Sequence, residues 1–236
     1  MNIYQLVTGF LFLLYFLGVL QFGLQKILIQ AVPVVLVTTV AGAILDYIEL
    51  KRLTVPRTPF ITGLIIGLIS QFGESALKLS AIGAAAMLVK FFIKLDGRHI
   101  FNPAASGIFA GMLIFNSQPS WWVGGGSIWP YLIWVPVFLL KFKRWAPMVG
   151  FLLPTMLFSG VSILNSSSLL FFLSVMLIEP KTSPGDIKLG LIYGLIVGFS
   201  YLILNTQYLI LNTLDPLILS LLVGNLGARL LGKFIV

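Results

Sequence analysis

The chain has 236 residues, of which 58% are hydrophobic and only 9% are charged, and its mean hydropathy is +1.05. Soluble domains carry about 25% charged residues, so this composition excludes a soluble globular surface and indicates an integral membrane protein. The net charge of +8 is typical of a membrane protein whose loops carry lysine and arginine, and it does not indicate a nucleic-acid-binding surface. The lack of cysteine excludes disulfides and thiolate-bound iron–sulfur clusters.

Ten apolar segments follow one another along the chain and predict an all-α membrane domain. A full crossing needs about 20 residues, and several of these segments are shorter. The first lacks the basic start and small-residue cleavage site of a signal peptide, so it is interpreted as a retained span. The segments cover residues 5–24, 28–46, 59–72, 76–94, 102–116, 128–141, 146–163, 167–179, 188–204 and 213–231.

Positive charge favours ten crossings over a topology in which the third and eighth segments turn back. With ten crossings, 13 of the 15 lysines and arginines lie on the side of both termini, and only Lys26 and Lys78 lie opposite. The positive-inside rule then predicts a multi-pass plasma-membrane protein with cytoplasmic termini. The short segments must be tilted, broken or shielded from lipid by other helices.

The segments divide into two groups of five, residues 1–117 and 118–236, within one transmembrane domain. An odd number of crossings inverts the second group relative to the first, as in transporters built from inverted repeats. Both FNPAASGIFAGMLIF (101–115) and LDPLILSLLVGNLGARLL (214–231) open with Asn-Pro or Asp-Pro and continue apolar. They either reflect a duplication or merely start helices, because Asn and Asp are good N-caps and proline suits the first turn.

Helices that begin inside a bilayer expose amide N–H groups, and three such starts are candidate sites for an anion or the polar edge of a cofactor. Thr58 and Thr62 mark the first, Asn102 and Ser106 the second, and Asp215 the third. The Asp215 carboxylate either belongs to an ion or solute path, as an acid within a span suggests, or caps an exposed helix end.

His99, the only histidine, stands just before the Asn-Pro pair. A single histidine excludes bis-histidine haem and gives no metal site. It is either an interfacial hydrogen-bonding group or a proton carrier. No Walker loop, catalytic triad or zinc pattern is present in the sequence, so no catalytic residue is assigned.

Two stretches, IFNPAASG (100–107) and MLIEPKTSPG (176–185), resemble motifs of the RnfD/NqrB family. Its members are membrane components of Rnf electron-transport complexes and of sodium-translocating NADH:quinone reductases. They carry an NPA-type motif and, later, Asp-Pro-x-(Thr/Ser)-(Ser)-Pro. Glu179 stands where the family usually has aspartate. The matching residues are Asn102, Pro103, Ala104, Pro180, Thr182, Ser183 and Pro184.

The resemblance implies a fold similar to that of urea transporters, a flavin in the membrane domain, and electron transfer coupled to Na⁺ or H⁺ movement. It also implies partner proteins that oxidise NADH or ferredoxin, since a chain without cysteine cannot hold thiolate clusters. Family members attach FMN through a threonine in Ser-Gly-Ala-Thr, whereas residues 108–175 offer only FSGVS (158–162). The expected cofactor is therefore FMN or riboflavin bound non-covalently.

The sequence therefore predicts the membrane subunit of a flavin-dependent, ion-translocating electron-transport complex. The two motifs, with Thr58, Thr62 and Ser106, are expected to hold the flavin, and Glu179, Asp215 and His99 to line the path of the ion, proton or solute. The alternative function is a urea-transporter-like channel or transporter for a small solute, built on the same inverted repeat with broken helices.

Overall fold

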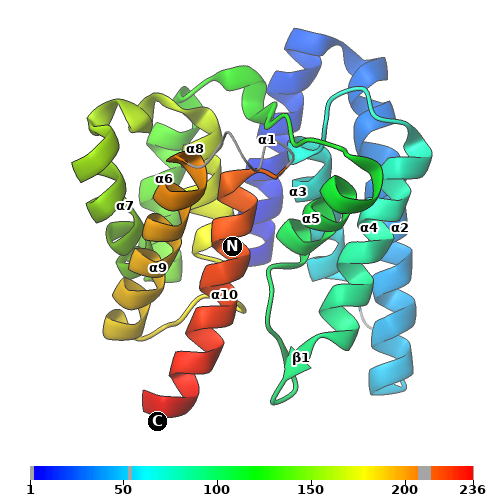
Figure 1. Ribbon diagram of the computed structural model, residues 1–236. Helices are drawn as coiled ribbons and strands as arrows, with labels where there is room; N and C mark the ends of the chain where they lie inside the picture. The colour runs from blue at the N-terminus through cyan, green and yellow to red at the C-terminus, as the bar shows by residue number, and fades with distance from the viewer. Residues whose placement is uncertain (1–2, 53–54, 207–213, 236) are drawn as a thin grey trace. The chain divides into compact units, whose positions relative to one another are not determined.

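The computed structural model describes residues 3–52, 55–206 and 214–235, and these residues are predominantly helical (Figure 1). Each of the ten predicted apolar segments contains a helix. The helices are α1 (Ile3–Phe22), α2 (Leu24–Leu50), α3 (Arg57–Ile69), α4 (Ala76–Phe92), α5 (Pro103–Phe115), α6 (Trp129–Phe142), α7 (Trp145–Ser159), α8 (Ser167–Phe171), α9 (Ile187–Thr206) and α10 (Pro216–Ile235). Short 3₁₀ turns, η1 (Val123–Gly126) and η2 (Val161–Asn165), lie before α6 and before α8.

The chain folds as two compact units. The first consists of Met1–Ile93 and Pro103–Gly125, and the second of Lys94–Asn102 and Gly126–Val236. In the first unit α2 packs on α3 and α4, and α4 packs on α5; in the second, α7 packs on α9, and α9 packs on α10. The segment Lys94–Asn102 belongs to the second unit although the chain on both sides of it belongs to the first, a division that differs from a single cut after residue 117.

Among the residues that the structure describes, three helices, α1, α2 and α9, are long and apolar enough to cross a membrane. Helix α2 carries apolar side chains on its outer face, where Leu36, Val40 and Ile44 are 58%, 55% and 54% exposed. Its opposite face buries the polar residues Gln30 and Thr38. A helix on a water-soluble surface has the reverse distribution, so this exposed apolar stripe is typical of a face in contact with lipid.

Helix α3 has only 13 residues, and two of its carbonyl groups accept hydrogen bonds from side chains of the first unit. The Tyr15 hydroxyl donates to the carbonyl of Leu64 (2.8 Å), and the Trp122 indole N–H donates to the carbonyl of Gly67 (2.9 Å). Both bonds are buried. Gly67 lies in the last turn, where a helix leaves carbonyls without partners, so the Trp122 donor satisfies one of them and helps a half-length helix to end in apolar surroundings.

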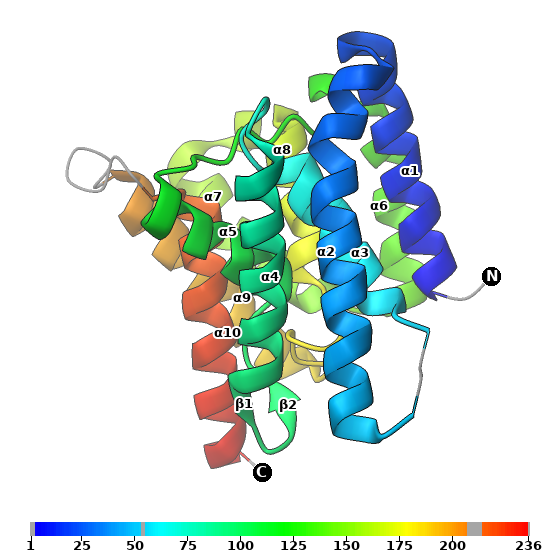
Figure 2. The ribbon, with the colours of Figure 1, turned by 90° about the vertical axis from the view of Figure 1, so that its right-hand side faces the viewer.

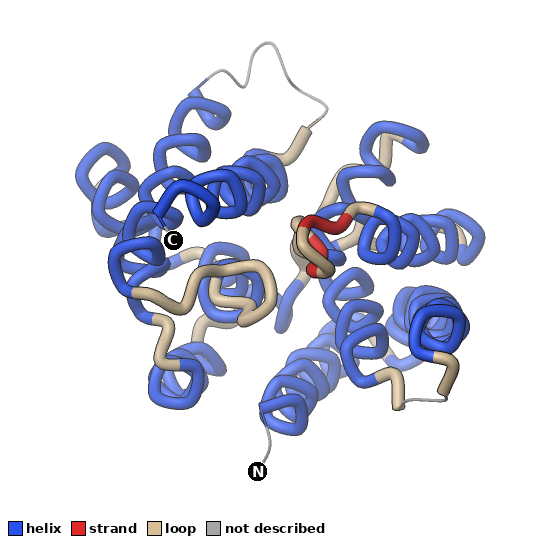
Figure 3. Tube along the Cα trace, turned by 90° about the horizontal axis from the view of Figure 1, so that it is seen from below, coloured by secondary structure: helices blue, strands red, loops and turns tan. Residues whose placement is uncertain are grey.

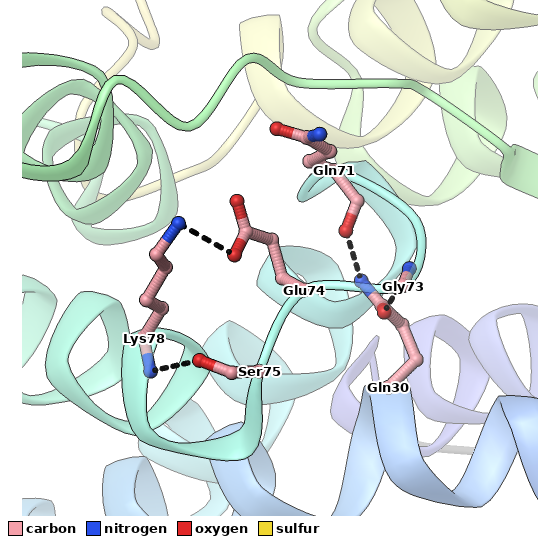
Figure 4. A network of polar contacts seen from close by, with 6 residues as sticks. All are labelled: Gln30, Gln71, Gly73, Glu74, Ser75 and Lys78. Carbon is pink, nitrogen blue, oxygen red and sulfur yellow. Dashed lines mark hydrogen bonds and ion pairs between the residues drawn. The ribbon is translucent and has the colours of Figure 1, made fainter.

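The turn after α3 is held by a buried glutamine of α2. The Gln30 side chain donates to the carbonyl of Gln71 (2.9 Å) and accepts from the N–H of Gly73 (3.2 Å). Figure 4 shows these bonds beside the ion pair between Lys78 and Glu74, whose atoms are 3.2 Å apart at the i,i+4 spacing of a helix turn. Gln30 thus satisfies the backbone of the turn with both halves of its amide.

The eighth apolar segment is not a regular helix. Helix α8 passes directly into a π-helical turn, η3 (Phe172–Leu177), whose side chains are mostly buried. Single π turns are rare and occur frequently at functional sites. Here the π turn ends two residues before Glu179, the first polar residue of the second predicted motif.

One β-hairpin is present in the described residues, and it is drawn in red in Figure 3. Strand β1 (Lys94–Leu95) pairs antiparallel with β2 (Arg98–His99). The turn residues Asp96 and Gly97 both have positive φ, 53° and 74°, as a type I′ turn requires. The prediction of ten apolar segments contained no strand at this place, although Asp-Gly is a favoured dipeptide for such a turn.

Candidate functional site

The loop after η3 folds around the backbone and side chain of Glu179. The Glu179 carbonyl accepts from the N–H of Thr182 (3.2 Å) and of Ser183 (2.9 Å), and also from the Ser183 hydroxyl (2.8 Å). The Thr182 hydroxyl donates to Oε2 of the Glu179 carboxylate (3.0 Å). The sequence Glu-Pro-Lys-Thr-Ser-Pro therefore forms a tight loop, because two hydroxyl side chains close it on the residue that begins it.

Asn102, which precedes α5, binds this loop directly. Its Nδ2 donates to the same Oε2 of Glu179 (2.8 Å), and its backbone N–H donates to Oδ1 of Asn225 in α10 (2.8 Å). Asn102 is 2% exposed and Asn225 is 0% exposed, so neither amide can exchange its protein partners for bulk water. The two predicted motifs, far apart in the sequence, thus meet at one carboxylate oxygen within the second unit.

The hydrogen bonds continue from Asn225 to Tyr193 of α9, whose hydroxyl accepts from Asn225 Nδ2 (3.0 Å). We call the connected residues Tyr193, Asn225, Asn102, Glu179 and Thr182 the carboxylate network. It joins α9, α10, the segment before α5 and the loop after η3. A buried polar network in which every member has partners fixes one arrangement of the elements that carry it.

Two arginines bind the outer side of the same loop. Arg144, the residue before α7, donates to the carbonyl and the hydroxyl of Ser183, the latter at 3.1 Å. Arg229 of α10 donates to the carbonyls of His99 (3.4 Å) and Lys181 (3.3 Å). Burial lowers the pKa of the Arg144 guanidinium, but an arginine keeps its charge at physiological pH. The loop therefore contains the Glu179 carboxylate and is contacted by two positive charges.

The remaining residues of the first motif continue into α5 of the first unit. Pro103, Ala104 and Ser106 are buried in its first turns, and the Ser106 hydroxyl donates to the carbonyl of Pro103 (2.9 Å). The hydroxyl of Ser106 is therefore used within its own helix. In the second motif, Thr182 and Ser183 are buried, whereas Pro180 is exposed and Pro184 is half-buried.

Thr58 and Thr62 lie on α3 in the first unit, outside the carboxylate network. The Thr62 hydroxyl donates to the carbonyl of Thr58 (2.9 Å), and the Thr58 hydroxyl accepts from the Lys90 ammonium (3.4 Å). His99 lies on β2 of the hairpin and is buried. The structure brings Asn102, Glu179 and the hydroxyls of the second motif together, and the predicted roles of Thr58 and Thr62 in holding a cofactor stay predictions.

Asp215 caps α10. Its Oδ1 accepts from the N–H of Ile218 (2.9 Å), and Pro216 occupies the first helical position. This is the arrangement in which an aspartate side chain satisfies an N–H group that the helix leaves without a partner. A role of the same carboxylate in an ion path stays a prediction.

Replacement of Asp215 separates the two roles. Asp215→Ala is expected to lower the free energy of unfolding by about 1 kcal/mol through loss of the cap, whereas Asp215→Asn keeps an acceptor at the same place and should be nearly neutral. Thermal unfolding in detergent measures both. If the Asn variant is stable but loses ion transport, the charge serves the path; equal destabilisation of both variants would contradict the cap.

Sequence reasoning missed four residues of this site: Asn225, Tyr193, Arg144 and Arg229. Asn225 carried a usable signal, because an amide inside an apolar helix segment needs a partner in the bundle. Tyr193 and Arg144 carried no comparable signal, since tyrosine is common in membrane helices and an arginine between two spans fits the charge rule alone.

Neither a protein-family model nor a curated protein matches the sequence.

Proposed function

We propose that the chain is the membrane subunit of a flavin-dependent, ion-translocating electron-transport complex, similar to the RnfD/NqrB proteins of Rnf complexes and sodium-translocating NADH:quinone reductases. One observation carries the proposal. The two motifs on which the resemblance depends bind each other through Asn102 Nδ2 and Glu179 Oε2, 2.8 Å apart. Unrelated segments that match a family by chance have no reason to meet at their polar residues.

The proposal includes ten membrane crossings in two inverted groups of five helices, with both termini in the cytoplasm of a cell whose plasma membrane holds the protein. The exposed apolar face of α2 and the like order of helix pairing in the two units support it. The concentration of 13 of the 15 lysines and arginines on one side supports the orientation. Partner proteins supply the oxidation of NADH or ferredoxin, because this chain has no cysteine for iron–sulfur clusters.

The donors of the site fit the polar edge of a flavin in kind. That edge carries carbonyl and ring-nitrogen acceptors, and the amide of Asn102 and the hydroxyls of Thr182 and Ser183 are donors of the matching kind. All three donate to Glu179 in this structure, so a bound flavin would replace Glu179 as their acceptor. These residues would hold FMN or riboflavin without a covalent bond. A bound flavin supplies one- and two-electron transfer. The chain itself excludes water, orients the donors through the Glu179 carboxylate, and places the Arg144 charge beside the loop.

The experiment is purification from native membranes under mild detergent, followed by a visible spectrum of the protein and its co-purified partners. Oxidised flavin is expected in proportion to the chain. The Asn102→Ala variant should lose most of this flavin, whereas Lys141→Gln, a change at an exposed lysine, should retain it. Absence of flavin from the wild-type protein together with its partners would overturn the proposal.

A small-solute channel or transporter of the urea-transporter kind is the second candidate. The observation that favours it is the pair of short apolar helices, α3 and the α8–η3 segment, which take the same position in the order of helices of each unit. Interrupted helices of this kind form solute sites in inverted-repeat transporters. Proteoliposomes test it: urea and ammonium should equilibrate faster than in empty vesicles, and equal rates would exclude this candidate.

A further inference from the structure

We infer that the first unit carries a groove for an anionic phospholipid, formed by the start of α1, the middle of α2 and the start of α3. The inference does not depend on the proposed function, and it concerns a part of the chain that lies outside the carboxylate network. Figure 2 shows the start of α1, the end of α2 and the start of α3 at the same end of the first unit. Loops rich in lysine and arginine lie at the ends of membrane helices, close to the membrane surface.

The groove consists of two adjoining hollows in the surface of the first unit. One has a volume of about 590 Å³ and the other about 520 Å³. Phe12 of α1 and Phe60 of α3 line both, so the two hollows form one continuous depression along the helices. A ligand that occupies it must therefore be long, and its two ends meet different surroundings.

The second hollow is an apolar slot. It is lined by side chains of α1, α2 and α3, among them Phe16, Val32 and Leu36, which are exposed. These residues belong to the same lipid-facing surface as the apolar stripe of α2 described above. Only a hydrocarbon chain or an apolar side chain gains free energy by filling such a slot.

The first hollow is different, because polar side chains line it. Gln5 and Thr8 of α1 and Thr39 of α2 lie there with Arg57. Within the described part of the chain, Thr39 Oγ1 is shielded from solvent and has no hydrogen-bond partner. The preceding Thr38, in contrast, donates to the carbonyl of Val34 (2.9 Å). Because this oxygen is shielded, a ligand in the hollow does not reach it. The polar groups that a ligand meets there are the exposed side chains of Gln5 and Arg57.

Arg57 brings positive charge to the first hollow, which is the polar end of the groove. Arg57 is the first residue of α3, and Pro56 before it offers no side-chain cap to the helix. The positive end of the helix dipole adds to the guanidinium charge. Lys51 and Arg52 follow α2 in the preceding loop. An apolar slot that leads to the exposed Arg57 guanidinium matches an acyl chain that leads to a phosphate, and the charge selects a net anionic headgroup.

A helix of a partner protein is the other occupant that could fill an apolar groove. An apolar membrane helix would cover the slot but would bring no negative charge to Arg57, whereas an anionic phospholipid brings an acyl chain and a charged headgroup together. The combination of apolar slot and cation therefore favours the phospholipid.

Lipid retention in native mass spectrometry tests the inference. The full-length protein in detergent is titrated with phosphatidylglycerol or, separately, with phosphatidylcholine of the same acyl chains. The wild-type protein should bind phosphatidylglycerol about fivefold more tightly, the factor expected of one basic residue at an anionic headgroup. Arg57→Gln should abolish this preference, and Lys188→Gln, a change at an exposed lysine of the second unit, should keep it.

A second variant blocks the groove without a change of charge. An added Cβ at Gly9, which lines the polar end, meets nothing within 4 Å, so Gly9→Leu can enter the groove without a clash in the protein. It should lower the binding of both lipids. Equal affinity of the wild-type protein for both lipids, or an unchanged preference in Arg57→Gln, would overturn the inference. So would a photo-cross-linker at Phe16 that attaches to a protein instead of a lipid in native membranes.

Discussion

Glu179→Leu is expected to destabilise the protein more than any other single change in the carboxylate network. The leucine leaves two donors, Asn102 Nδ2 and the Thr182 hydroxyl, without their acceptor. Both residues are at most 4% exposed, so water cannot replace the carboxylate. Each buried donor without a partner costs about 1–3 kcal/mol, and the two losses should add to a large fraction of a typical folding free energy.

Glu179→Gln is the matched control, because the glutamine side chain has the same length and keeps an oxygen that can accept from one or both donors. Its loss should be clearly smaller and should reflect only the weaker bonds of a neutral acceptor. The midpoint of thermal unfolding, followed by tryptophan fluorescence in detergent, compares the two. If leucine and glutamine lower the midpoint equally, the network does not hold the loop after η3 in place.

Gly194→Ala is expected to disrupt the packing of α9 on α7. A Cβ at this position would lie 2.2 Å from the carbonyl oxygen of Pro147 and 2.9 Å from Cα of Gly150. Both atoms belong to the backbone and cannot rotate away, so the two helices must separate. Gly190, Gly194 and Gly198 recur every four residues, the spacing by which small residues bring membrane helices together. The expected loss is about 1–3 kcal/mol or more.

Gly9→Ala is the control for this change. Gly9 lies in α1, where an added Cβ meets nothing within 4 Å. Alanine favours a helix over glycine by up to about 1 kcal/mol, so the control should be neutral or slightly stabilising. Gly194→Ala has the same gain in helix propensity and should nevertheless yield less folded protein in size-exclusion chromatography. Equal yields of the two variants would show that α7 and α9 are not in backbone contact.

The positions of the helices could be predicted because composition decides them. The apolar runs are separated by short stretches that contain charged or polar residues, glycine or proline, and the structure contains a helix in each run. The same holds for Asp215, since Asp-Pro before an apolar run specifies a cap and a first turn at once. The lengths differed at the helix ends. Helix α2 continues through exposed residues to Leu50, beyond the predicted end at residue 46, and is followed by Lys51 in the left-handed region. Helix α7 stops at Ser159, because Gly160 follows it with a φ of 76°.

The site could be predicted only in part. Asn102, Glu179 and Thr182 were found through the motifs, but their meeting at one oxygen atom depends on the fold of the loop after η3. The transfer of Lys94–Asn102 to the second unit was not foreseen, because no local pattern shows which unit a hairpin joins. The bond from the backbone N–H of Asn102 to the Asn225 side chain is an example. A backbone N–H is the same for nearly every residue type, so such a bond leaves no motif at the donor position.

The meeting of Asn102 and Glu179 is the claim on which the account rests, and the absence of cysteine from the chain allows a direct measurement. The double variant Asn102→Cys/Glu179→Cys, treated in native membranes with a short thiol-reactive cross-linker, should form an internal cross-link in most molecules. Each single variant should form none and serves as the control. Failure of the double variant to cross-link, although it elutes as folded protein in size-exclusion chromatography, would contradict the account.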